Sequence, residues 1–226
     1  MKEIFERYNI TLNDEQLKKF DKYYRLLVHY NSMFNLTAII EREEVYKKHF
    51  VDSLLGVDNV TMETLIDVGS GGGFPAIPLK IVNPNIKLTL LEATGKKCEF
   101  LKTVVSELDL KDVTVINGRA EDYAKNPDFR EKFDHASARA VARLNTLLEY
   151  CLPFVKIGGS FISYKANAKD EIAECDNALK ILGGSIQKVK EYTLDDANRS
   201  IIIVKKEKST PPKYPRGQGK ERKNPL

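Results

Sequence analysis

Residues 65–75 read Leu-Ile-Asp-Val-Gly-Ser-Gly-Gly-Gly-Phe-Pro, an apolar run that ends in four glycines within five positions. This stretch predicts a buried strand, a loop and then a helix, because Pro75 suits a first helical turn, where its missing N–H is not needed. Glycines in such a loop permit positive φ and let the backbone approach a ligand that lies over the strand ends. We therefore expect residues 65–75 to build one wall of a binding pocket.

Short apolar runs alternate with helical patterns on the C-terminal side of this loop. The predicted strands are 65–68, 88–92, 113–117, 135–138, 160–164, 186–192 and 200–205, and the predicted helices are 74–82, 96–108, 144–152 and 168–182. Such alternation is typical of βαβ units and of a parallel sheet that is buried on both faces. The connection at 195–199 is too short for the crossover that parallel neighbours require, so the last two strands should be antiparallel.

The N-terminal part has a different pattern. Apolar residues recur at steps of three and four from about 13 to 35, which predicts an amphipathic helix with Thr11 or Asn13 as its N-cap. A second helical stretch is expected at 41–55, and polar residues at 58–63 should close it. The predicted organisation is a helical cap at 1–60, an α/β domain at 61–206 and a basic flexible tail at 207–226.

Composition excludes several classes of protein. No run reaches the roughly 18 consecutive apolar residues that a membrane span needs, so no membrane partner is expected. Cys98, Cys151 and Cys175 are never paired as C-x-x-C, which argues against a disulfide framework and against a structural zinc site. A protein of the reducing cytoplasm, without a metal, fits this pattern.

Positive charge is concentrated at the C-terminus. Residues 205–226 carry eight Lys or Arg against two Glu, a net charge of +6, while the whole chain carries +4, so the remainder carries −2. With four prolines, this tail is not expected to pack a core, and it is interpreted as an arm that attracts phosphates. A merely solubilising terminus is the alternative.

Three ligands could use the glycine loop. A nucleoside triphosphate would require G-x-x-x-x-G-K-[ST], and no Lys-Ser or Lys-Thr follows these glycines. A dinucleotide would require Gly or Ala where Phe74 stands. S-adenosylmethionine has no pyrophosphate, so Phe74 is tolerated and can wall its pocket. A parallel sheet that ends in an antiparallel hairpin also indicates a Rossmann-like class I S-adenosylmethionine-dependent methyltransferase, with a mostly parallel seven-stranded sheet and an antiparallel last strand.

Other candidate cofactor residues follow neighbouring strands. Glu92 ends the second strand, about 20 residues beyond the glycine loop, where an acid can accept hydrogen bonds from two ribose hydroxyls. Asp67 either orients the loop that contains Gly69 and Gly71 or approaches the methionine ammonium group. Residues 118–122 follow the third strand, where an adenine would lie, although an ordinary surface loop is the alternative.

Several motifs together resemble the RsmG (GidB) family, which methylates N7 of a guanosine in bacterial small-subunit ribosomal RNA. The motifs are Asn35-Leu36-Thr37, residues 49–53, 67–78, Arg119-Ala120-Glu121, Ala138-Arg139-Ala140, Leu152-Pro153, Tyr164-Lys165 and residues 213–216. The resemblance implies S-adenosylmethionine as cofactor and S-adenosylhomocysteine as product. It also implies cofactor contacts from a set of five residues: Gly69, Phe74, Ala120, Glu121 and Arg139. Two positions depart from the common pattern, since Glu92 stands where many members have Asp and Tyr164 where many have Leu.

Guanine N7 carries a free lone pair, so its methylation needs no general base, and alignment of the reacting atoms is the main requirement. No obligatory catalytic residue is therefore predicted, and Arg139 and Lys165 are expected to act in positioning. The candidate RNA contacts are Asn35, Arg143, Lys165 and Arg199. Asn35 and His49 either line the pocket or make structural hydrogen bonds.

The expected substrate is small-subunit rRNA or the small ribosomal subunit, methylated by a monomer in the cytoplasm. A small-molecule methyltransferase is one alternative, which the basic tail disfavours. The other is a non-enzymatic ribosome-assembly factor that retains cofactor binding, which the intact glycine loop and Glu92 disfavour.

Overall fold

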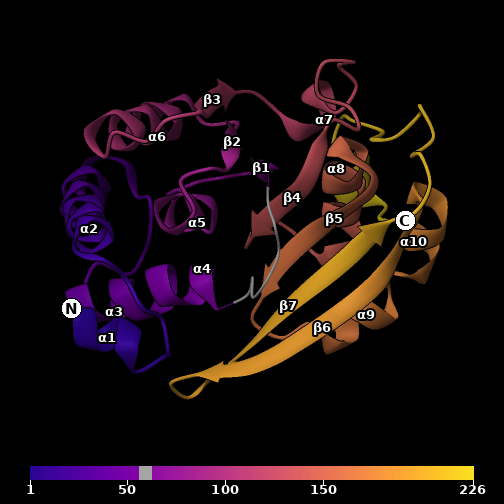
Figure 1. The fold of residues 1–226 in the computed structure, drawn as a ribbon. Helices are drawn as coiled ribbons and strands as arrows, with labels where there is room; N and C mark the ends of the chain where they lie inside the picture. Colours follow the sequence, from indigo (N-terminus) through magenta and orange to yellow (C-terminus); the bar gives the residue numbers. More distant parts are fainter. Residues whose placement is uncertain (56–62) are drawn as a thin grey trace.

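The computed structural model describes residues 1–55 and 63–226 (Figure 1). Its centre is a seven-stranded sheet in the order β3-β2-β1-β4-β5-β7-β6. The strands are β1 (Thr64–Val68), β2 (Lys87–Glu92), β3 (Val113–Asn117), β4 (Phe133–Arg139), β5 (Val155–Lys165), β6 (Gly184–Leu194) and β7 (Ala197–Lys206). Strand β7 runs antiparallel to both of its neighbours, whereas the pairs from β3 to β5 are parallel. The predicted class I methyltransferase topology is confirmed.

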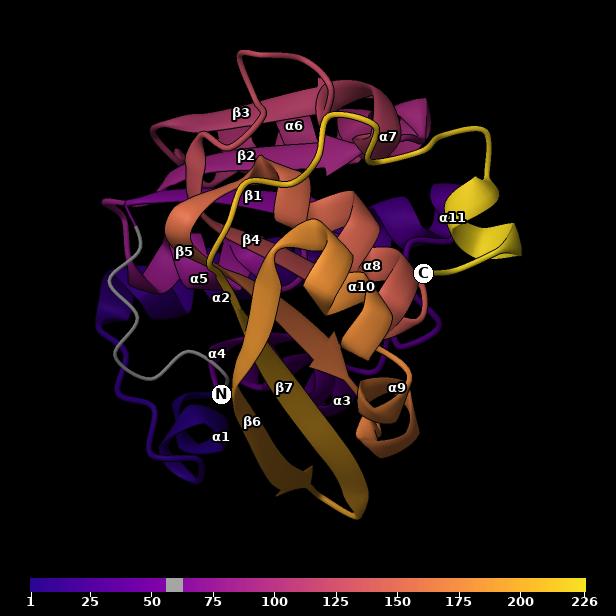
Figure 2. The same ribbon diagram turned by 90° about the vertical axis from the view of Figure 1, so that its right-hand side faces the viewer.

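Helices cover both faces of the sheet because successive strand side chains point to opposite sides. In β1, Leu65 belongs to a first core, whereas Ile66 and Val68 belong to a second. Helices α5 (Ala76–Val82) and α6 (Gly95–Glu107) contribute to the first core, and α8 (Leu144–Cys151) and α10 (Asp176–Leu182) to the second. Figure 2 shows α8 and α10 in front of the sheet and α5 behind it.

The N-terminal helices pack onto α5 and α6 and share the first core. They are α1 (Lys2–Glu6), α2 (Asp14–Phe34), α3 (Arg42–Val45), a π-helical segment (Tyr46–Val51) and α4 (Asp52–Leu54). Asn13 is the N-cap of α2 and forms a capping box with Gln16. The expected boundary at residues 60–61 lies outside the described residues, as does most of the polar stretch 58–63.

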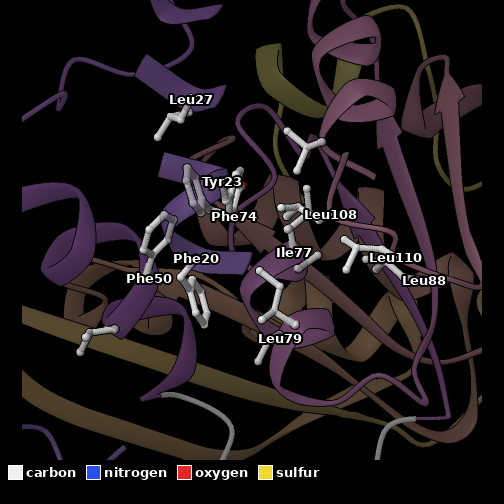
Figure 3. Packing of buried hydrophobic residues seen from close by; sticks show 14 of the residues in the cluster. Phe20, Tyr23, Leu27, Phe50, Phe74, Ile77, Leu79, Leu88, Leu108 and Leu110 are labelled. Atoms are coloured by element: carbon white, nitrogen blue, oxygen red, sulfur yellow. The ribbon is translucent and has the colours of Figure 1, made fainter. Parts of the chain in front are cut away.

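Aromatic packing joins the helical cap to the glycine loop. The Tyr23 ring of α2 stacks on Phe74, with centroids 5.4 Å apart, and on Phe50, at 5.2 Å (Figure 3). The Tyr23 hydroxyl is buried and donates a hydrogen bond to the Gly72 carbonyl. The cap therefore supports the loop directly.

A Tyr23→Phe variant tests this support. The change leaves the Gly72 carbonyl without its buried donor, at a cost of about 1–3 kcal/mol in the free energy of unfolding. We expect chemical denaturation to show this loss and calorimetry to show weaker S-adenosylmethionine binding. The matched control is Tyr8→Phe, because the Tyr8 hydroxyl makes an exposed hydrogen bond to Asp195, far from the loop in sequence. Equal effects of the two changes would contradict the proposed support.

Some short elements differ from the sequence-based expectation. The helix predicted at 168–182 is two helices, α9 (Lys169–Ala173) and α10, and Gly183 ends α10 with φ +81°. The sequence pattern did not predict four short elements, which are α1, α7 (Ala120–Tyr123), α11 (Lys220–Lys223) and a 3₁₀ turn (Leu152–Phe154). One or two helical turns are too short to show a periodic apolar pattern. No described helix is long and apolar enough to cross a membrane.

The C-terminal tail packs against the domain, contrary to the expectation of a flexible arm. Tyr214 is buried in the second core, and the buried Glu149 of α8 accepts three hydrogen bonds from the Arg216 side chain, at 3.0, 3.2 and 2.7 Å. The Arg130 guanidinium donates to the carbonyls of Thr210 and Tyr214 at 2.7 and 2.9 Å. The physical reason is that the buried partners of the tail lie in the α/β domain, so its own composition does not reveal them.

Candidate active site

Two adjoining cavities open at the carboxyl ends of the parallel strands, the edge at which open α/β sheets bind ligands. The larger, of about 760 Å³, is lined by the glycine loop, Glu92 and Arg139. The smaller, of about 230 Å³, is lined by residues 118–121 and Tyr150. They share four lining residues, Gly69, Ala93, Val141 and Arg222. An elongated ligand can therefore extend from one cavity into the other.

The glycine loop takes backbone conformations that side chains disfavour. Gly69 has φ +73° and Gly71 has φ +55°. A Cβ atom on Gly69 would also lie 2.8 Å from Cγ2 of Val141, which is closer than van der Waals contact. Both glycines line the larger cavity, so the sequence-based prediction that they admit a ligand to the backbone agrees with this geometry.

Glu92 holds the loop and faces the larger cavity. Its Oε2 accepts a hydrogen bond from the Gly71 N–H at 2.9 Å, and its Oε1 accepts one from the Thr94 N–H at 2.8 Å. An ionised carboxylate offers about four lone-pair positions, so two remain for further donors. These two acceptor positions match the two hydroxyl donors of a ribose.

Asp67 is fully enclosed beneath the loop. Its Oδ1 accepts a hydrogen bond from the Ser137 hydroxyl at 2.6 Å, while Oδ2 has no partner among the described residues. Burial raises the pKa of this carboxyl to about 7. Because Asp67 lines neither cavity, its position favours orientation of the loop over direct contact with an ammonium group.

The raised pKa predicts a pH-dependent stability. The unfolded chain releases the Asp67 proton near pH 4, whereas the folded protein retains it to about pH 7. The folded state therefore loses stability as pH rises through this window, relative to an Asp67→Asn variant that has no proton to release. We expect the difference in unfolding free energy between the two proteins to change from about pH 4 to 7 and then level off. Urea titrations across pH would contradict this if the difference stayed constant.

Arg139, at the end of β4, is fixed by three contacts. Its Nη1 lies 3.2 Å from Asp52 Oδ2, its Nη2 lies 3.1 Å from His49 Nδ1, and its guanidinium carbon lies 4.8 Å from the Phe74 ring centroid. His49 stacks on the same Phe74 ring at 4.5 Å. Arg139 therefore presents a charged group in a defined orientation at the larger cavity.

His49 is a neutral positioning group. Burial and the neighbouring Arg139 charge lower the pKa of its imidazole to about 3. Its Nε2 lies 2.8 Å from the Thr37 hydroxyl, and its Nδ1 lies 3.1 Å from both Arg139 Nη2 and the Lys48 carbonyl. Of the two roles considered for His49, the structure shows both: it lines the cavity and makes structural hydrogen bonds.

Asp52 connects the helical cap to the β6–β7 hairpin, which extends toward the N-terminal helices (Figure 1). Its Oδ1 accepts a hydrogen bond from the Tyr192 hydroxyl at 2.9 Å and lies 3.5 Å from Arg199 Nε. Tyr192 and Arg199 line the larger cavity with Asp52 and Arg139. Sequence reasoning missed the roles of Asp52 and Tyr192, because residues 140 positions apart carry no local signal of their contact.

The remaining candidate residues are placed unequally. Lys165 lines the larger cavity, where its Nζ lies 2.8 Å from Glu171 Oε2 and 2.5 Å from the Ala142 carbonyl. Ala120 and Glu121 line the smaller cavity. Asn35 is exposed at the end of α2, beside cavity-lining Leu36 and Thr37. Arg143 lines neither cavity and forms an exposed ion pair with Glu174.

Further basic residues of the cavity lining, Lys48 among them, were not foreseen. Lys97 and Arg222 add positive charge to the lining, and Arg222 comes from the tail. In the described part of the chain, His, Cys, Asp and Glu form no group that could hold a metal ion.

Comparisons with known proteins identify the family of this chain. A family model described as rRNA small subunit methyltransferase G (GidB) matches residues 16–202. A protein of Acetivibrio thermocellus named ribosomal RNA small subunit methyltransferase G is 48% identical over 97% of this chain and 92% of its own length. One of that name from Alkaliphilus metalliredigens is 45% identical over 100% of this chain and 97% of its own.

Solved structures support the fold alone. A putative methyltransferase of Haloferax volcanii, solved in complex with the Trm112 methyltransferase activator, superposes with a TM-score of 0.58 at 13% identity, covering 80% of this chain and 98% of that one. A SAM-dependent methyltransferase from Aquifex aeolicus superposes with a TM-score of 0.53 at 16% identity, covering 73% and 94%.

Proposed function

Because the chain belongs to the rRNA small subunit methyltransferase G family, we propose that it transfers the methyl group of S-adenosylmethionine to N7 of a guanosine in small-subunit rRNA. The observation that carries this proposal is the larger cavity, which places Glu92 in one lining with the Arg139 cluster, namely Arg139, His49, Asp52, Tyr192 and Arg199. This cavity also shares four lining residues with the smaller one. S-adenosylhomocysteine would be the product.

The residues present fit this cofactor. Glu92 would accept hydrogen bonds from the ribose hydroxyls, and Gly69 and Gly71 would lie against the methionine part. Ala120 and Glu121, in the smaller cavity, would lie at the adenine. When bound, the cofactor supplies an electrophilic methyl group.

The chain's own groups would position the guanine. N7 needs no deprotonation, and both ring nitrogens of His49 are already engaged, Nε2 by Thr37 and Nδ1 by Arg139. Arg139 suits a bidentate contact with guanine O6 or a phosphate, and it is held in place by Asp52 and Phe74. Its role is then alignment of the reacting atoms, with a further contact to the cofactor.

RNA would approach the open side of the larger cavity. Arg199 and Lys165 on its wall, with Asn35 and Arg143 outside it, are the proposed RNA contacts. The substrate would be small-subunit rRNA or the small ribosomal subunit, which places the protein in the cytoplasm, and we propose that it acts as a monomer. A target that is buried in folded RNA would have to be exposed first.

Methyl transfer from radiolabelled S-adenosylmethionine tests the proposal. The substrates are small subunits and deproteinised small-subunit rRNA from cells that lack this gene, with large subunits as the control. We expect label in small-subunit rRNA alone. Label confined to small molecules of a cell extract would instead support a small-molecule methyltransferase. Cofactor binding with no transfer to either RNA substrate would support an assembly factor.

A further inference from the structure

The last turn of the tail is fastened to α8 beside the cofactor cavities. The main-chain N–H of Arg216 donates to Glu149 Oε1 at 2.8 Å, in addition to the three side-chain bonds. The Thr146 hydroxyl donates to the Glu221 carbonyl at 3.0 Å, and the buried Glu221 carboxylate accepts from the Gly217 N–H. These contacts fix the direction in which residues 217–223 cross the domain.

This fastening brings the tail to the cavities. Gly219 and Arg222 line the smaller one together with residues 118–121, and Figure 2 shows α11 beside α8. Arg222 also lines the larger cavity, and in the smaller cavity it shares the lining with Tyr150. Of the four residues that both cavities share, Gly69, Ala93 and Val141 belong to the α/β domain, and Arg222 belongs to the tail.

We propose that residues 214–223 form the outer wall of the adenosine half of the cofactor site, and that Arg222 is a cofactor-binding residue. This inference rests on the proposed function for the identity of the ligand. A ligand whose ribose lies at Glu92 and whose adenine lies at Ala120 passes the junction that Arg222 covers. Its guanidinium can donate to ribose oxygens or adenine nitrogens, which are acceptors without charge. The concentrated positive charge of the tail thereby acquires a role besides attraction of RNA.

Binding of S-adenosylhomocysteine and of adenosine, measured by calorimetry on the full chain, tests this wall. We expect Arg222→Ala to weaken both ligands by the same factor of about fivefold to tenfold, the loss of roughly one hydrogen bond. Lys223→Ala is the matched control, because Lys223 is an exposed cation of the same turn that lines neither cavity. We expect this control to change affinity less than about twofold. Both residues are exposed, so neither change should impair folding, and thermal unfolding will verify this.

A chain that ends at Gln218 provides the second variant. It keeps Tyr214 and the Arg216–Glu149 pair but removes Gly219 and Arg222, so we expect a loss of adenosine affinity at least as large as for Arg222→Ala.

Four outcomes would contradict the proposal that the tail forms this wall. They are unchanged affinity of Arg222→Ala, an equal loss with Lys223→Ala, a loss for S-adenosylhomocysteine without one for adenosine, and a loss confined to RNA binding. The first of these, with tight binding by the unaltered chain, removes the inference and leaves the proposed function intact. Failure of the unaltered chain to bind S-adenosylhomocysteine would remove both.

Discussion

Replacing Glu92 with Gln is expected to weaken S-adenosylmethionine binding by about 100-fold or more. The two carboxylate oxygens accept hydrogen bonds from the backbone N–H groups of Gly71 and Thr94. In the Gln variant an NH₂ group replaces one of these oxygens, and this group donates hydrogen bonds where the carboxylate accepted them. Two charge-assisted hydrogen bonds to ribose, each worth about 1.5–3 kcal/mol, account for the expected factor. Calorimetry with S-adenosylmethionine and S-adenosylhomocysteine would measure it.

The control for this change is Glu99→Gln, because Glu99 is an exposed glutamate of α6 whose side chain pairs with Lys102. The affinity of the Glu99→Gln variant for S-adenosylmethionine should match that of the unaltered chain. Unfolding of the Glu92→Gln variant should be followed in parallel, since the loop also loses a charged partner. A folded variant that retained full affinity would remove Glu92 from the site.

Arg139→Ala carries the second largest expected effect, a fall in the rate of methyl transfer of about 100-fold to 1,000-fold. The change removes the group that would orient guanine, and misplacement of reacting atoms by about 1 Å costs roughly 100-fold. It also leaves the buried Asp52 with Tyr192 and Arg199 as its side-chain partners among the described residues. Single-turnover transfer to small-subunit rRNA at saturating cofactor would measure the loss.

Arg139→Lys should recover only part of this rate. A lysine keeps the charge, but it cannot contact Asp52 and His49 with a rigid planar group stacked on Phe74. Arg25→Ala is the control, because Arg25 is an exposed residue of α2 in an i,i+4 pair with Asp21. Full activity of a folded Arg139→Ala variant would contradict the positioning role.

Local patterns predicted the sheet, and they singled out the glycine loop and Glu92, which line the larger cavity. The glycine loop and the short 195–199 connection act within a few residues, and Glu92 ends the strand that follows the loop, so their placement follows from sequence alone. The Arg139 cluster could not be predicted in the same way. Its members come from the cap, β4 and the terminal hairpin, and only the folded topology brings Asp52 within reach of Tyr192.

The tail shows how composition can mislead. Prolines and like charges indicate a solvated segment when every partner is in the same segment. Here the partner of Arg216 is Glu149 of α8, and Arg130 holds the carbonyls around Pro211. Buried charges of a folded domain can therefore order a tail that has little apolar content of its own.

The most direct test of guanosine N7 methylation is to identify the atom that receives the methyl group. Small-subunit rRNA from cells lacking this gene would be treated with the protein and S-adenosylmethionine, then reduced with borohydride and cleaved with aniline, which breaks the chain at 7-methylguanosine. The proposed function predicts one cleavage site that requires the protein and is nearly lost with Arg139→Ala. It also predicts that mass spectrometry finds 7-methylguanosine as the new nucleoside. A methyl group on another atom or another nucleoside would contradict it.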